Sequence, residues 1–321
     1  MTAPYRTEDA VTQVAVVGAG TIGASWITAF LAKGLAVTAV ENSAETRDQL
    51  RATIARNWIG MEAAGLVASG ASPDRLTILS DLRELEGRPI DFVQENVREQ
   101  LDLKRETLQG IDAVVAPDVI IASSTSGLTA SSIQQGCRHP ERVLVGHPMN
   151  PPHLIPLVEV VGGERTAPGA VDAVIRLYRA LGKRPVRLDK EIVGHIVTRL
   201  TAALWQEAAF LVDAGVASVE DVDLAVTHGL GLRLAVAGPH MVYHMGGGAG
   251  GLAGFFSWAR GPLQSWCADL RPVILDSALE AKLVAGAVAA AGGRSIAELA
   301  ERRDVALSGI LRLLHSGPSS S

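Results

Sequence analysis

Four polar side chains that together could bind and deprotonate an alcohol lie within or shortly after predicted strands. His147 directly follows a short apolar, β-branched run, and Asn150 comes three residues later. Glu159 lies inside another apolar run, where a carboxylate is costly to bury unless it has a partner. Ser126 closes a Ser-Thr-Ser segment after a third run. This combination is suited to removing a proton from an alcohol near neutral pH.

Each of these residues has a predicted role. His147 accepts the hydroxyl proton, while Glu159 fixes the tautomer of the ring and stabilises the imidazolium that forms. Ser126 and Asn150 hydrogen-bond the substrate oxygen or a nicotinamide amide. Structural alternatives remain open, because a histidine at a strand end is often a satisfied structural residue and serines commonly cap helices. Glu159 can equally pair with a lysine or an arginine.

A glycine-rich turn precedes these residues in the chain. Gly18, Gly20 and Gly23 have Gly-x-Gly-x-x-Gly spacing between a predicted strand and a predicted helix that begins at Thr21 and Ile22. The first glycine permits a tight turn, the second lets a pyrophosphate approach, and the third allows close packing of helix and strand. We expect the free N–H groups at the helix start to face the phosphates.

An acid at the end of the second predicted strand strengthens this interpretation. Glu41 stands 23 positions after Gly18, where a carboxylate accepts ribose hydroxyls and repels a 2′-phosphate. No arginine directly follows it, so NAD is favoured over NADP as the cofactor. FAD, which uses the same fingerprint, and a glycine-rich turn in an unrelated α/β fold are the alternatives.

The pattern around these motifs predicts an α/β protein with two domains. Short strand-like runs alternate with helical stretches over residues 1–189, which indicates a Rossmann-type doubly wound sheet, parallel in its first half. Residues 190–321 lack strand signals, and helices are expected at 198–214, 219–228 and 262–266, among others. We therefore predict an NAD-binding domain at 1–189 and a mostly α-helical substrate and dimerisation domain at 190–321.

Composition narrows the functional classes. A net charge of −5 does not favour nucleic-acid binding. No uninterrupted apolar run of about 18 residues predicts a membrane span. The N-terminal stretch carries Glu8 and Asp9 and is not typical of a signal peptide. We therefore expect a soluble cytoplasmic protein. We also expect no metal site, because His240 and His244 have metal-ligand spacing but no evident third ligand.

Together these residues resemble the L-3-hydroxyacyl-CoA dehydrogenase superfamily over almost the whole chain. The resemblance rests on the glycine fingerprint, Glu41, His147 with Asn150-Pro151, and Glu159. It implies that the histidine is the general base, that the glutamate orients it, and that the helical domain mediates a homodimer. It also extends the expected cofactor site to Glu95, Glu99 and Lys104.

One position departs from the family pattern and bears on the substrate. Thr198 stands before Arg199-Leu200 where the family usually has asparagine. The sequence resembles branches of the superfamily that act on free 3-hydroxy acids, and this resemblance makes L-carnitine the leading candidate. Candidate contacts for its carboxylate and quaternary ammonium are Arg199, Arg233 and Tyr243. The alternatives are L-gulonate, a 3-hydroxyacyl-CoA, and a crystallin-like protein that binds NAD without catalysis. His153 and His195 are further candidates near the cleft.

Overall fold

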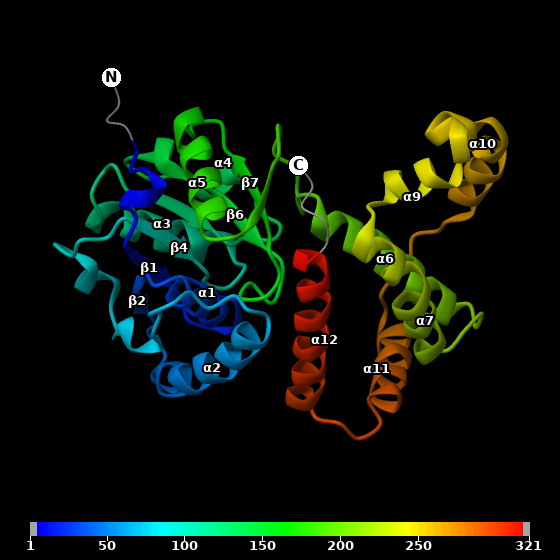
Figure 1. Cartoon of the computed structure of the whole chain (residues 1–321), viewed down its shortest axis with the longest axis horizontal. Coiled ribbons are helices and arrows are strands. Elements are labelled where there is room, and N and C mark those ends of the chain that lie inside the picture. The colour runs from blue at the N-terminus through cyan, green and yellow to red at the C-terminus, as the bar shows by residue number, and fades with distance from the viewer. Residues whose placement is uncertain (1–4, 317–321) are drawn as a thin grey trace. The chain divides into compact units, whose positions relative to one another are not determined.

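The computed structural model describes residues 5–316 (Figure 1). These residues form two compact units. The first consists of the chain up to Arg199 together with the part from Asp304 onward, and the second is Leu200–Arg303. Both boundaries fall inside helices, α6 (Val197–Asp213) and α12 (Ile296–Ser316). The predicted domain boundary between residues 189 and 190 stays a prediction.

Within residues 5–316, eight strands form one sheet in the order β3-β2-β1-β4-β5-β6-β7-β8. Neighbouring strands are parallel except β6 and β7, which run antiparallel. The order reverses between β1 and β4, and ligands bind at this switch point in doubly wound sheets. The predicted Rossmann-type fold is thus confirmed. The strands are β1 (Gln13–Val17), β2 (Ala36–Val40), β3 (Leu76–Leu79), β4 (Phe92–Glu95), β5 (Ile120–Ser123), β6 (Val143–Pro148), β7 (Leu157–Gly162) and β8 (Arg184–Arg187).

Helices cover both faces of the sheet. Successive strand residues point to opposite faces, so Val14 and Val16 of β1 pack with α1 and α5, whereas Ala15 and Val17 pack with α3 and α4. Figure 1 shows these helices around the strands. Burial on both faces explains the nearly continuous apolar strands. The longer helices of this unit are α1 (Thr21–Ala32), α2 (Ala44–Ala63), α3 (Leu101–Val114) and α5 (Pro168–Ala180), and α4 (Ala130–Ile133) is a single turn.

The second unit is helical, as the sequence predicts. The helix expected at 219–228 ends as an α-helix at Ala225 and continues as one π-helical turn, and the segment expected at 262–266 lies inside the longer α10. Glycines precede α10 because of close packing: a Cβ on Gly247 would lie 1.7 Å from the carbonyl oxygen of Gly251. The helices are α7 (Val219–Ala225), η5 (Val226–Leu230), α8 (Gly231–Val236), α9 (Pro239–Gly246), α10 (Gly251–Asp269) and α11 (Ser277–Ala291), in addition to most of α6.

Across residues 5–316, no single helix combines the length and apolar composition needed to cross a bilayer. A bent pair, α11 with α12, meets that requirement only when the two are taken together, on length and composition alone.

Candidate active site

The turn between β1 and α1 has the shape that its three glycines predict. Gly18 has a φ of +85°, which glycine adopts without strain. A Cβ at Gly18 would lie 2.9 Å from the carbonyl group of Asn96, and one at Gly23 would lie 1.9 Å from the carbonyl oxygen of Gly18. Side chains at these two positions would therefore separate β1 from α1 and from the end of β4.

The start of α1 is open at Gly20. Gly20 is the N-cap, and Thr21 and Ile22 form the first turn. Within the described chain, no atom beyond the adjoining residues lies within 4 Å of the Cβ position at Gly20. A phosphate can therefore approach the N–H groups of the helix start, where the helix dipole favours negative charge.

A cavity of about 580 Å³ opens at the switch point between β1 and β4. Glu41 directly follows β2, and its two carboxylate oxygens accept hydrogen bonds from the backbone N–H groups of Ala19 (2.8 Å) and Ser43 (2.9 Å). The glycine turn and this carboxylate fit the pyrophosphate and ribose of a dinucleotide. Residues that line the cavity include Gly18, Gly20, Glu41, Ser43, Asn96 and Arg98.

His147 and Glu159 are brought together by strand pairing. They are register partners on the antiparallel strands β6 and β7, and Nδ1 of His147 lies 2.8 Å from Oε2 of Glu159. Both side chains are buried. The other carboxylate oxygen of Glu159 accepts hydrogen bonds from the backbone N–H groups of Ile196 (2.7 Å) and Val197 (3.1 Å), where α6 begins. The carboxylate thus has three donors.

The charge of Glu159 determines the tautomer of His147. Burial raises the pKa of Glu159, but the hydrogen bonds from the imidazole and from two backbone N–H groups outweigh burial and lower the pKa below its usual value. An ionised carboxylate only accepts hydrogen bonds, so Nδ1 of His147 must carry the proton. In the neutral ring Nε2 then holds the lone pair, and the one side-chain hydrogen bond found for this imidazole among the described residues is that of Nδ1. This is the arrangement of a general base.

A second imidazole lies beside His147. The ring centroid of His195 is 5.3 Å from that of His147, and its Nε2 lies 3.1 Å from the carbonyl oxygen of Thr125. That carbonyl can only accept, so Nε2 of His195 carries a proton. Burial, followed by the proximity of His147, lowers the pKa of His195, which favours the neutral ring. Its φ of +47° is rare for a residue with a Cβ, and such conformations cluster at functional sites.

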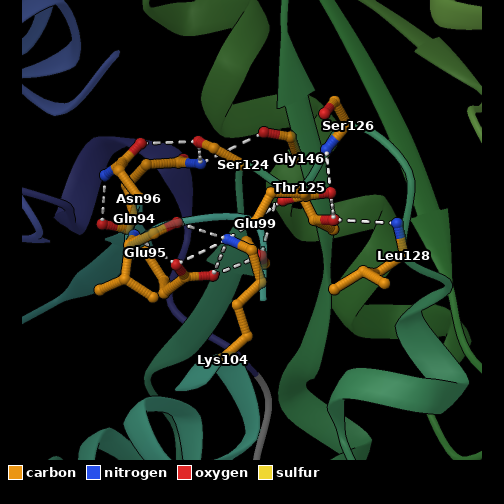
Figure 2. Close-up of polar contacts among 12 residues, drawn as sticks. Gln94, Glu95, Asn96, Glu99, Lys104, Ser124, Thr125, Ser126, Leu128 and Gly146 are labelled. Atoms are coloured by element: carbon orange, nitrogen blue, oxygen red, sulfur yellow. Dashed lines mark hydrogen bonds and ion pairs between the residues drawn. The ribbon is translucent and has the colours of Figure 1, made fainter. Parts of the chain in front are cut away.

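Glu99 holds the loop that carries Ser126 (Figure 2). Its Oε1 accepts hydrogen bonds from Oγ1 of Thr125 (2.5 Å) and from the backbone N–H groups of Ser126 (3.1 Å) and Gly127 (2.9 Å). Burial raises the pKa of Glu99, but these bonds and the charge of Lys104 outweigh it and lower the pKa. The ionised carboxylate therefore fixes the loop after β5.

Glu95 and Lys104 form a buried ion pair below this loop. Nζ of Lys104 lies 2.9 Å from Oε1 of Glu95 and 3.6 Å from Oε2 of Glu99. It also donates to the carbonyl oxygen of Val97 (2.9 Å), and Glu95 accepts from the hydroxyl of Ser123. Neither partner of this pair is among the residues that line the cavity. Its observed contacts support the ends of β4 and β5.

The other predicted site residues are more dispersed. Asn150 is exposed on a bend after β6, and Thr198 is half-buried in the first turn of α6. Arg199 is exposed in that same turn. Arg233 on α8 and Tyr243 on α9 belong to the second unit. No hydrogen bond joins Asn150, Thr198 or Arg199 to His147 or Glu159 within the described residues, and the roles of all five residues toward a substrate stay predictions.

Sequence reasoning missed part of the cavity lining. Asn96 directly follows β4, and Ser43 follows Glu41 and caps α2, where its hydroxyl accepts from the N–H of Thr46 at 3.2 Å. The carboxyl ends of parallel strands meet at one edge of the sheet, so the rule that identified Glu41 could also have identified Asn96. Arg98, two residues further on, lacks any comparable signal.

A dinucleotide crevice at the switch point and an imidazole–carboxylate pair on the neighbouring strands β6 and β7 define an NAD-dependent oxidoreductase of the Rossmann type. Comparison with known families gives the same class. The 3-hydroxyacyl-CoA dehydrogenase NAD-binding domain matches residues 13–192, and the C-terminal domain of that family matches residues 194–287. The chain belongs to the 3-hydroxyacyl-CoA dehydrogenase family, which confirms the predicted resemblance and NAD as the cofactor.

Individual relatives are similar over nearly their whole length. L-carnitine dehydrogenase from Streptomyces coelicolor is 45% identical, with 97% of this chain and 96% of the relative covered. The Pseudomonas aeruginosa L-carnitine dehydrogenase is 43% identical over 92% of both chains. Among solved structures, 5-formyl-3-hydroxy-2-methylpyridine 4-carboxylic acid 5-dehydrogenase has a TM-score of 0.81 at 29% identity, covering 95% of this chain and 99% of that one. (S)-3-hydroxybutyryl-CoA dehydrogenase PaaH1 from Ralstonia eutropha has a TM-score of 0.64 at 28% identity, covering 86% and 95%.

Proposed function

We propose that this protein oxidises the 3-hydroxyl group of L-carnitine to 3-dehydrocarnitine with NAD, and that His147 is the base. The observation that carries the chemistry is the 2.8 Å contact between His147 and Glu159 in the same unit as the dinucleotide cavity. The choice of substrate is supported by the carnitine dehydrogenases, which are 40–45% identical over at least 92% of this chain.

The proton follows a path set by the tautomer of His147. When bound, NAD supplies the hydride acceptor, and the protein must take the hydroxyl proton. Nε2 of His147 accepts that proton, and the ring becomes an imidazolium whose Nδ1–H continues to donate to Glu159. The carboxylate compensates the new charge without itself moving, because two backbone N–H groups hold its other oxygen.

The loop after β5 and the start of α6 supply candidate substrate contacts. Ser126 and Asn150 hydrogen-bond the reacting oxygen or the nicotinamide amide, and Thr198 lies in the first turn of α6, near the N–H groups that bind Glu159. A carnitine carboxylate suits a bidentate guanidinium, from Arg199 or Arg233. The quaternary ammonium cannot donate a hydrogen bond and suits an aromatic face, for which Tyr243 is a candidate.

We further propose that the protein works in the cytoplasm as a homodimer formed through the helical unit. Large apolar side chains of Leu200–Arg303 are exposed: Leu232 by 60%, Val236 by 75%, Trp258 by 62% and Ile274 by 83%. Burial of such side chains against a second copy of the chain would be favourable. Light scattering on the purified protein should give twice the mass of the chain, and a monomer mass at micromolar concentration would reject this assembly.

A substrate panel tests the activity. NADH formation is measured with L-carnitine, D-carnitine, L-gulonate, 3-hydroxybutyrate and 3-hydroxybutyryl-CoA, each with NAD and with NADP. We expect the highest kcat/KM for L-carnitine with NAD. The His147→Ala variant should bind NADH normally and lose about 10² to 10⁴ in kcat, the usual contribution of a general base.

Each other outcome of the panel has a distinct meaning. Activity on the CoA thioester alone would reject the free-acid substrate, and a preference for gulonate would replace carnitine as the substrate. If NADH binds but no compound is oxidised, the protein is an NAD-binding protein without this catalysis. Full turnover by His147→Ala would reject His147 as the base while leaving the substrate assignment intact.

A further inference from the structure

A buried glutamine connects strand β4, which ends at the dinucleotide cavity, with strand β6, which carries His147. Gln94 of β4 is fully buried, and its Nε2 donates to Oγ of Ser124 (2.8 Å) and to the carbonyl oxygen of Gly146 (3.2 Å), the residue before His147 (Figure 2). Strand β5 lies between β4 and β6, so this side chain reaches across a whole strand. Ala122, the register partner of Gln94 on β5, leaves room for the crossing.

Tyr178 of α5 fixes the orientation of that amide. Its hydroxyl donates to Oε1 of Gln94 at 2.6 Å, which leaves the NH₂ group to face Ser124 and Gly146. Burial raises the pKa of Tyr178, so the phenol stays protonated and remains a donor. A Cβ on Gly146 would lie 2.2 Å from the hydroxyl oxygen, so glycine at this position makes the arrangement possible.

Ser124 extends the connection to the dinucleotide cavity. Its Oγ accepts from Nε1 of Trp26 on α1 (3.2 Å) and donates to Oδ1 of Asn96 (2.7 Å). Asn96 lines the cavity, and its carbonyl group abuts Gly18 of the glycine turn. One chain of hydrogen bonds therefore runs from the carbonyl group next to His147 to the wall of the cavity.

We propose that Gln94 is a positioning residue that holds the strand of His147 at a fixed distance from the cofactor cavity, with Tyr178 setting its amide orientation. The inference rests on the proposed function. Hydride and proton leave the same carbinol group, so the base and the nicotinamide must be placed together. Misplacement by about 1 Å can cost on the order of 100-fold in rate.

Two variants and their combination separate positioning from stability. Gln94→Met retains the volume and removes every hydrogen bond of the amide, and we expect kcat with L-carnitine to fall at least about tenfold, while KM and the Kd for NADH change less than about threefold. Tyr178→Phe should give a smaller loss of kcat. Tyr5→Phe is the control, since that phenol also donates one hydrogen bond, in its case to the backbone carbonyl oxygen of Glu141 at 3.2 Å. It should keep wild-type kinetics.

The double variant Gln94→Met, Tyr178→Phe decides the question. Gln94→Met leaves the buried phenol of Tyr178 without its acceptor, and Tyr178→Phe leaves the amide oxygen of Gln94 without its donor. The double variant contains neither the amide nor the phenol, so its urea midpoint should recover relative to Gln94→Met. We expect kcat to stay low. A kcat that recovers with the midpoint, or that stays wild-type in Gln94→Met, would overturn the inference.

If the wild-type protein oxidises nothing in the panel, the proposed function fails, and the inference is tested separately. The ¹⁵N-resolved imidazole signals of His147 in the NADH complex should then differ between wild type and Gln94→Met but not between wild type and Tyr5→Phe. Identical His147 signals in all three proteins would overturn the positioning role.

Discussion

Replacing Glu159 by glutamine preserves the shape of the side chain and removes its charge. Two backbone N–H groups, of Ile196 and Val197, point at Oε1. The amide oxygen of the variant will stay with these donors, because an NH₂ group there would face N–H groups. The NH₂ group then faces Nδ1 of His147, which has to become an acceptor. The ring proton moves to Nε2, and the lone pair that receives the substrate proton is lost.

Two losses set the magnitude. A hydrogen bond to a charged group contributes about 1.5–3 kcal/mol, which corresponds to roughly 10- to 150-fold in rate at about 1.4 kcal/mol per factor of ten. The unfavourable tautomer adds to this, and the comparable aspartate-to-asparagine change in a Ser–His–Asp triad costs roughly 10⁴ in kcat. We therefore expect Glu159→Gln to lower kcat/KM by about 10² to 10⁴.

The assay is NADH formation at saturating NAD, with NADH binding measured in parallel to show that the cavity is intact. Glu191→Gln is the matched control, because this carboxylate also accepts from a backbone N–H, that of Ser131 at 2.7 Å, within the same unit. It should keep kcat/KM within about twofold, as expected of a substitution outside the reacting groups. A Glu159→Gln protein that retains more than about a tenth of wild-type turnover would refute the tautomer argument.

Three further outcomes follow from the same contacts. Glu41→Ala should raise the KM for NAD at least about tenfold and reduce the preference for NAD over NADP, both measured by initial rates. The reason is that the carboxylate partner of the ribose is lost, together with the hydrogen bond from the N–H of Ala19 that holds the glycine turn. Lys104→Met removes the cationic partner of the buried Glu95 carboxylate, which keeps only the hydrogen bonds from Ser123 and Val97. It should lower the free energy of unfolding in urea by about 3–5 kcal/mol, with partial recovery on adding Glu95→Gln. Because the pKa of Glu159 is lower in the folded state, its ionised form stabilises the fold above the unfolded pKa, near 4.3, and this contribution disappears as pH falls through the folded value. The stability difference between wild type and Glu159→Gln should therefore shrink below about pH 4, and a difference that grows on acidification would contradict the assignment.

Local patterns were sufficient to predict the crevice and the imidazole–carboxylate pair. The glycine turn is encoded within six residues, and its shape follows from close backbone contacts that exclude a Cβ at Gly18 and Gly23. His147 and Glu159 could be paired because an unpaired carboxylate inside an apolar strand is too costly to bury. The cost of burial predicted that Glu159 has a partner, and the antiparallel register of β6 and β7 places His147 opposite it.

The supporting shell could not be predicted, because its contacts join residues far apart in the chain. Tyr178 is 84 positions from Gln94, and neither residue type at its place in the sequence distinguishes a bridging role from ordinary burial. His195 was singled out near the cleft, but its left-handed backbone and its bond to Thr125 depend on the loop that precedes α6. Periodicity carries no information about such contacts.

The reversal of direction at β7, which β8 shares, explains how a mid-strand carboxylate reaches the active edge of the sheet. In a parallel sheet, reactive groups stand at the carboxyl ends of strands, as Glu41 and Asn96 do. Strand β7 enters from that edge because it runs antiparallel to β6, so Glu159 near its beginning faces His147 near the end of β6. The register is fixed by packing, since Val158 and Val160 belong to one core cluster and Val161 to the other. A slip of one residue would move the carboxylate to the opposite face and bury it without the imidazole, so the apolar residues on either side of Glu159 are as necessary for the pair as its own charge.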